Sequence, residues 1–183
     1  MNLGLDQKVA VVLAASKGLG KASAMALSAE GAKVIIGSRN AAELNEAAED
    51  ISSKTGNEVS CFPVDVSNSE QLTSFINGAG SIYGRIDILV NNAGGPPFGK
   101  FESFDDTQWQ QAYEQNLLSF VRTSRLVLPF MKKAGSGRII NIVSGSVKSV
   151  LTNSVLSTAM RMGVVGTAKM LADEIRRLWN YRQ

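Results

Sequence analysis

The sequence predicts an α/β fold in which helices cover both faces of a parallel sheet. Two observations lead to this prediction. Short Val- and Ile-rich runs alternate with helical patterns along the 183 residues, and no repeat or low-complexity linker breaks the order. Apolar residues (44%) far outnumber charged ones (19%), so we expect a globular chain that forms one domain over residues 1–183.

The first strands and helices follow from residue type and turn signals. Residues 8–13 (KVAVVL) and 33–37 (KVIIG) are short apolar runs flanked by turn residues, which is typical of buried strands. Residues 20–30 are Ala-rich and end at Gly31, and residues 41–54 form an acidic, Ala-rich stretch closed by a glycine. Both stretches predict helices.

The next strand is predicted over residues 58–63, where we expect the single cysteine, Cys61, to be a small core residue. A helix is expected over residues 67–83, because Ser67 and Glu70 form a capping-box pattern. Residues 86–90 (IDILV) predict a fourth strand.

The last third of the chain predicts a long helix, a strand and a second long helix. These elements occupy residues 106–133, 137–143 and 154–179. A long loop is expected over residues 91–103. Five strands alternating with helices indicate a doubly wound parallel sheet, for which we expect the strand order 3-2-1-4-5.

Composition excludes several function classes. The chain has no histidine, which removes Ser-His-Asp and Cys-His catalysis and every His-ligated metal site. The net charge is only +3, and Lys and Arg are spread along the chain, so we expect no nucleic-acid partner. No apolar run approaches the roughly 18 residues that span a membrane, and the N-terminus has no signal-peptide pattern. We therefore expect a cytoplasmic protein with no metal site and no membrane partner.

A glycine-rich turn follows the first strand. Gly18 and Gly20 lie between this strand and the next helix, where backbone N–H groups and the helix dipole favour a phosphate. Ala14 stands where a third glycine is expected, and its Cβ would crowd the turn. Taken alone, the pattern suits either a dinucleotide site or a plain strand–helix turn.

Three further motifs accompany the segment SKGLG. They are NNAG directly after the fourth strand, Asn116 within YEQNLLSF, and Ser144 at the end of GRIINIVS. In this order and spacing, the four motifs resemble the short-chain dehydrogenase/reductase family over nearly the whole chain. The resemblance implies a Rossmann-type fold that binds NAD(P) across the carboxyl ends of the strands, and a carbonyl or alcohol substrate.

The resemblance also implies an assembly and a longer chain. A homodimer or homotetramer would bury residues 117–128 and 163–171, where small residues such as Gly163 and Gly166 let helices approach. Family members continue past the last helix with two more strands and a substrate loop, so we expect the sequence to be truncated or incomplete at this end. Residues 176–183 suit either a continued helix or a substrate-loop helix.

The second strand ends without the acid that selects NAD, because Ser38, Arg39 and Asn40 stand there. Arg39 and Lys17 are able to grip a 2′-phosphate, so we expect NADP(H) rather than NAD(H). The alternative is that both are solvated surface cations. Asp65 matches the family's adenine contact, a role that is compatible with capping the following turn. The expected cofactor-binding residues are Ala14, Ser16, Lys17, Gly18, Leu19, Gly20, Ser38, Arg39, Asn40, Asp65, Val66, Asn92, Ala93 and Gly94.

The catalytic centre departs from the family pattern. The family works through an Asn, a Ser, a Tyr and a Lys, of which Asn116 and Ser144 are present. Ser157 stands at the Tyr position and Arg161 at the Lys position. A serine hydroxyl is far less acidic than a phenol, whose pKa is about 10, and Arg stays protonated, so it gives no proton relay although it can still bind the ribose.

Two hypotheses follow from this departure. In the first, the protein is an NADP(H)-dependent oxidoreductase in which Ser144 holds the substrate oxygen, and Ser157 or a bound water passes the proton. In the second, it is a nucleotide-binding protein that has lost turnover and acts as a sensor or partner subunit.

Overall fold

The computed structural model describes residues 3–180, with side chains for residues 3–176. The chain forms two compact units. The sheet unit comprises residues up to 93 together with 122–142, and the helical unit comprises residues 94–121 together with those from 143 onward.

The strands of the described chain lie in the sheet unit. They are β1 (Val9–Leu13), β2 (Lys33–Ser38), β3 (Val59–Pro63), β4 (Ile88–Asn91) and β5 (Arg138–Asn141). All pairings are parallel, and the order is β3-β2-β1-β4-β5, which confirms the predicted parallel sheet and its expected strand order.

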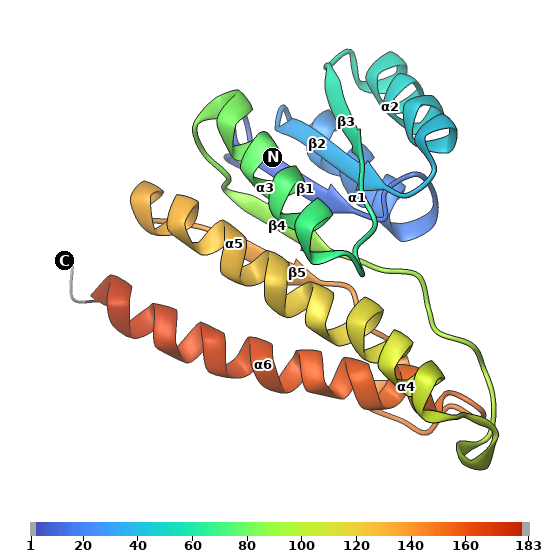
Figure 1. Ribbon diagram of the computed structural model, residues 1–183. Helices are drawn as coiled ribbons and strands as arrows, with labels where there is room; N and C mark the ends of the chain where they lie inside the picture. The colour runs from blue at the N-terminus through green and yellow to red at the C-terminus, as the bar shows by residue number, and fades with distance from the viewer. Residues whose placement is uncertain (1–2, 181–183) are drawn as a thin grey trace. The chain divides into compact units, whose positions relative to one another are not determined.

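Helices lie on both faces of this sheet (Figure 1). Helices α1 (Gly18–Ala29) and α2 (Ala41–Thr55) cover one face. The other face carries α3 (Ser69–Tyr83) and the part of α5 (Ser119–Ala134) that belongs to this unit. The predicted doubly wound α/β fold is therefore confirmed.

The core alternates across the sheet. Ala10 and Val12 of β1 pack with Leu44 of α2 on one face. On the other face, a Cβ added at Gly37 of β2 would come within 2.8 Å of the Phe75 ring of α3, so only glycine leaves room for this ring. Because central parallel strands are buried on both faces, they are continuous apolar runs, which is why the sequence pattern identified them.

Two expectations in the sheet unit are corrected. Cys61 is only half-buried, because β3 is an edge strand, and its Sγ donates to Asn45 Oδ1 at 3.2 Å. Burial, with a smaller contribution from the charge of Glu49, raises the pKa of the Cys61 thiol.

Helix α3 is capped by Asn68 rather than Ser67, since the Asn68 side chain accepts hydrogen bonds from the Glu70 and Gln71 N–H groups. Asn caps helices as well as Ser does.

The helical unit contains the long helix α6 (Val155–Asn180). The other elements of this unit are η1 (Phe101–Ser103), α4 (Asp106–Tyr113), η2 (Glu114–Leu118) and η3 (Gly145–Val147). The stretch predicted as one helix over residues 106–133 runs instead through α4, the π-helical turn η2 and α5. Helix α6 continues to residue 180, and residues 181–183 lie outside the described chain.

Within the helical unit, α6 packs against α4 and η2 around a small core that includes Ala112 and Leu156. A Cβ added at Gly163 would lie 3.0 Å from Leu117 Cδ2, so this glycine serves a close contact within the chain. No helix in the described part of the chain is both long and apolar enough to cross a membrane.

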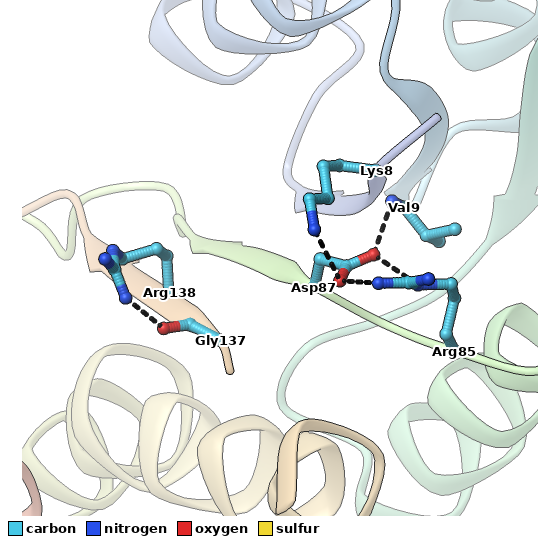
Figure 2. A network of polar contacts seen from close by, with 6 residues as sticks. All are labelled: Lys8, Val9, Arg85, Asp87, Gly137 and Arg138. Atoms are coloured by element: carbon cyan, nitrogen blue, oxygen red, sulfur yellow. Dashed lines mark hydrogen bonds and ion pairs between the residues drawn. The ribbon is translucent and has the colours of Figure 1, made fainter. Parts of the chain in front are cut away.

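A buried carboxylate joins the amino ends of β1 and β4 (Figure 2). Asp87 directly precedes β4 and is 4% exposed. It accepts hydrogen bonds from the Val9 N–H (2.9 Å) and from Arg85 Nε (2.8 Å), and Lys8 Nζ lies 3.9 Å away. Burial raises the pKa of Asp87, but the hydrogen bonds from Arg85 and Val9 and the charges of Arg85 and Lys8 outweigh burial and lower it overall.

Replacing Asp87 with Asn is expected to lower the free energy of unfolding by about 2–3 kcal/mol at neutral pH, because charge-assisted hydrogen bonds are lost. A carboxylate with a lowered folded pKa stabilises the fold above its unfolded pKa of about 3.9, and loses this effect as the pH falls through the folded value. The difference between wild type and variant should therefore be full above about pH 5 and shrink below about pH 4.

Urea unfolding across this pH range measures the Asp87 effect. Asp50→Asn is the matched control, because Asp50 pairs with Lys21 and Lys54 on the surface, where ion pairs contribute little. Equal stabilities of wild type and Asp87→Asn at neutral pH would contradict the prediction.

Candidate cofactor and catalytic sites

The predicted cofactor-binding residues, except Gly94 of the helical unit, lie at one edge of the sheet unit. Ala14 follows β1, Ser38 ends β2, Asp65 lies just after β3 and Asn92 follows β4. Asn92 Nδ2 donates to the Ala14 carbonyl oxygen at 3.3 Å and so joins two of these turns. The carboxyl edge of a doubly wound sheet is where such folds bind their ligands.

The glycine-rich turn is shaped by its two glycines. Gly18 has a φ of +57°, and a Cβ at Gly20 would overlap the Ala14 carbonyl oxygen. Helix α1 begins here without a side-chain cap from its N-cap residue Lys17. Its first N–H groups are therefore not used by a capping side chain, and Leu19 beside them is 66% exposed. This geometry fits an anion at the helix start.

Ala14, at the family's first glycine position, has a φ of +49°. This left-handed conformation costs an L-residue roughly 1–2 kcal/mol, whereas glycine adopts it freely.

The variant Ala14→Gly is therefore expected to raise the free energy of unfolding by about 0.5–1 kcal/mol, after the larger chain entropy of unfolded glycine is subtracted. Urea unfolding of the two proteins measures the difference, and Ala15→Gly is the control, because Ala15 has no positive φ and is buried. A loss of stability in Ala14→Gly would show that packing of the Ala14 methyl group outweighs its backbone strain.

The end of β2 carries an exposed cation beside a buried hydroxyl. The buried Ser38 hydroxyl has no hydrogen-bond partner among the described residues. Arg39 is exposed and forms no ion pair within the described chain, and no acid stands at residues 38–40. Asn40 caps α2 by accepting the Glu43 N–H at 3.2 Å. An unpartnered buried hydroxyl beside an exposed cation fits the phosphorylated ribose of NADP(H).

Glu43 is a charged residue that sequence reasoning missed. Its carboxylate lies 3.3 Å from Lys17 Nζ and accepts a hydrogen bond from Ser16 Oγ at 3.4 Å. It therefore connects the turn after β1 with the first turn of α2. The spacing of Asn40 and Glu43, which matches a capping pattern, was the available signal for this position.

Asp65 organises the turn after β3. Its Oδ1 accepts from the Ser67 N–H (2.9 Å) and hydroxyl (2.7 Å), while its own N–H donates to Gln71 Oε1 (2.8 Å). The predicted capping role of Asp65 is thus present in the structure. Val66 and Ala93, also in the predicted set, are buried beside these turns, and Gly94 belongs to the helical unit.

Asn91 holds the end of β4 in place. Its Nδ2 donates to Asn141 Oδ1 of β5 (2.9 Å) and Ser124 Oγ of α5 (3.2 Å), and its Oδ1 accepts from Thr123 Oγ1 (2.6 Å). The residue is fully buried. These contacts fix the strand end from which Asn92 and Ala93 project.

In the helical unit, Asn116 lies in the π turn η2 and is fully buried. Its Nδ2 donates to the Gly94 carbonyl oxygen at 2.7 Å, and the neighbouring Gln115 donates to the same oxygen at 2.9 Å. No donor among the described residues reaches Asn116 Oδ1. π turns often occur at functional positions, and a buried unpartnered acceptor suits a bound water.

Ser144 lies directly before η3, and its Oγ accepts the Ser146 N–H at 3.1 Å. This contact does not use the hydroxyl hydrogen of Ser144. The hydroxyls of Ser146 and Ser154 are buried without a partner among the described residues, a feature of this loop that the sequence did not reveal.

Ser157 and Arg161 lie four residues apart on α6 and therefore share one side of the helix. Arg161 is only 6% exposed, and its guanidinium lies 6.0 Å from the centre of the Phe120 ring. Burial lowers the pKa of Arg161. Helix α6, which carries Ser157 and Arg161, packs against η2 and η3. Asn116 lies in η2 and Ser144 directly precedes η3, so these elements of the helical unit lie together.

Known proteins with similar sequences belong to one family of oxidoreductases. A sequence model of the short chain dehydrogenase family matches residues 8–178. The ketoacyl reductase HetN of Nostoc sp. is 37% identical to this chain. The matched region covers 89% of this chain and 60% of the length of HetN. The uncharacterised oxidoreductase YvrD of Bacillus subtilis is 32% identical over 94% of this chain and 65% of its own length.

Solved structures agree with these relatives. L-sorbose reductase from Gluconobacter frateurii, complexed with NADPH and L-sorbose, has a TM-score of 0.93 at 31% identity, over 97% of this chain and 67% of that one. The F189W actinorhodin polyketide ketoreductase with NADPH has a TM-score of 0.87 at 32% identity, over 94% and 67% of the two chains. With the family match extending over nearly all of the described residues, this chain belongs to the short chain dehydrogenase family.

Proposed function

We propose that this protein is an NADP(H)-dependent oxidoreductase that acts on a carbonyl or alcohol substrate, in the manner of a 3-oxoacyl reductase. The cofactor assignment rests mainly on the exposed Arg39 at the end of β2, with no acid at residues 38–40. The similarity to HetN and to two reductases that contain NADPH supports the proposal.

The residues of the sheet unit would bind the nucleotide. Arg39 and Lys17 would hold the 2′-phosphate, and the first N–H groups of α1 would hold the pyrophosphate. Asp65 would contact the adenine. Asn92, which donates a hydrogen bond to the turn after β1, would support the ribose. When bound, the nicotinamide supplies or accepts the hydride.

The residues of the helical unit would act on the substrate. Ser144 would donate a hydrogen bond to the substrate oxygen, on which charge develops. Ser157, or a water beside it, would pass the proton. Arg161 would contribute a permanent positive charge but no proton relay. Proton delivery is therefore the weak step, and we expect slow turnover or an activated substrate.

A second candidate function is favoured by the same two positions, Ser157 and Arg161, where the family's Tyr and Lys are absent. In this alternative the protein binds the nucleotide as a sensor or partner subunit and does not turn over. Oxidation of NADPH by the purified protein with ketones, quinones and acyl carbonyls distinguishes the two. Turnover of any of these classes supports the oxidoreductase, and nucleotide binding without turnover supports the second function.

We also propose that the protein forms a homodimer or homotetramer that buries residues 117–128 and 163–171. Large apolar side chains are exposed on α6, among them Met162 (56%) and Met170 (59%). A helix face of this kind is typical of a surface covered by a second copy. Light scattering at micromolar concentration tests this assembly, and a monomer would contradict it.

A further inference from the structure

The corner of the sheet unit that carries the proposed 2′-phosphate cations also carries a carboxylate. Glu43 lies in the first turn of α2, and its Oε2 is 3.3 Å from Lys17 Nζ. The hydroxyl of Ser16 donates to the same oxygen at 3.4 Å. The two cations thus differ, since Lys17 is paired with an acid while Arg39 forms no ion pair among the described residues.

The pair is exposed and therefore weak. The Lys17 side chain is 79% exposed and that of Glu43 is 43% exposed, so water and salt screen their attraction. A ribose 2′-phosphate carries close to two negative charges and three strong acceptor oxygens, so it is a stronger partner for an ammonium group than one carboxylate. Lys17 can exchange one partner for the other, at the cost of the pair with Glu43.

We propose that Glu43 competes with the 2′-phosphate for Lys17 and so limits the preference for NADP(H) over NAD(H). The inference rests on the proposed NADP(H) binding and assigns a specificity-determining role to a residue outside the predicted site. A nucleotide without the 2′-phosphate leaves the Lys17–Glu43 pair intact. The effect of Glu43 should therefore be confined to 2′-phosphorylated nucleotides.

The test is the affinity of Glu43→Gln for 2′,5′-ADP and for 5′-AMP, measured by calorimetry, with NADPH and NADH measured in parallel. We expect about two- to fivefold tighter binding of the 2′-phosphorylated nucleotides, which is the effect of removing one exposed ion pair, and less than about a twofold change for the others. The gain should shrink as the salt concentration rises. Glu46→Gln removes the same charge from an exposed position further along α2 and should leave all affinities unchanged.

A second variant separates competition from simple repulsion. In a Lys17→Gln background, Glu43→Gln should give almost no gain, because the residue for which the two groups compete is gone. An equal gain in both backgrounds would show that Glu43 repels the phosphate directly and would overturn the competition. Weaker NADH binding by Glu43→Gln would also overturn it, since Glu43 would then be an acceptor for the ribose hydroxyls.

The outcome for the unmodified protein distinguishes this inference from the proposed function. Failure to bind NADPH, or equal affinity for NADPH and NADH, overturns the NADP(H) assignment and the role of Glu43 with it. A clear preference for NADPH that Glu43→Gln does not change overturns the role of Glu43 alone.

Discussion

Carbonyl reduction with NADPH is expected to rise by about 10²- to 10⁴-fold when Ser157→Tyr and Arg161→Lys are introduced together, because this is the usual contribution of a general acid. A phenol beside an ammonium group can donate a proton near neutral pH, whereas a serine hydroxyl cannot. Rates with simple ketones measure the effect most clearly, since these substrates need the acid most. Ser157→Tyr alone should give a smaller rise, because Arg161 takes no part in proton relay.

Three controls accompany the double variant. Thr158→Tyr with Arg161→Lys places the phenol on the next residue of α6, about 100° around the helix, and should give no rise. Ser144→Ala in the double-variant background should remove most of the rise by deleting the hydrogen bond to the substrate oxygen. Thermal unfolding checks the fold, since Arg161 is buried against Phe120 and its replacement changes that packing.

The unmodified protein decides how the double variant is interpreted. Absent turnover before the change and robust turnover after it would establish a nucleotide-binding protein that has lost catalysis. Robust turnover before the change would show that another group supplies the proton, and would contradict the proposed weakness at position 157.

Binding of NADPH is expected to be about ten- to a hundredfold tighter than binding of NADH, and Arg39→Asp should reverse this order. The factor corresponds to one charge-assisted contact of roughly 1.5–3 kcal/mol. An aspartate at this position would repel the 2′-phosphate and accept hydrogen bonds from the ribose hydroxyls of NADH. Titration of nucleotide fluorescence measures both constants.

Lys133→Asp is a control for the cofactor prediction, because Lys133 is an exposed cation on α5 outside both the predicted site and residues 117–128. It should leave the ratio of the two affinities unchanged. Equal affinities in the unmodified protein would contradict the assignment of Arg39.

The strand pattern illustrates what residue order can predict. Strands such as β1 are buried on both faces, so each one is a continuous apolar run that stands out from the amphipathic helices around it. The edge strand β3 is different, because only its first residue is buried, and the burial of Cys61 was overestimated for that reason. The start of α3 differed by the choice between two good capping residues, which only the backbone conformation decides.

In the candidate site, too, residue order predicts some features and not others. Gly18, Gly20 and Asn92 could be predicted because turn geometry restricts the residue types at their positions. The cation at the end of β2 was also readable from residue order, and its contact with a cofactor stays a prediction. The Lys17–Glu43 pair could not be predicted, because it joins side chains 26 residues apart through the packing of α1 against α2.

The sequence by itself determined the family, the parallel sheet and its strand order. It also places Ser157 and Arg161 where we expect the family's Tyr and Lys, and that assignment stays a prediction. These features depend on residue identity, spacing and periodicity, which are properties of the chain alone. Only the tertiary structure decided that Ala14 adopts a left-handed conformation, that Asn116 lies in a π turn bonded to Gly94, and that Arg161 is buried over an aromatic ring. The reason is that each of these depends on contacts between segments distant in sequence, and such contacts exist only once the chain has folded.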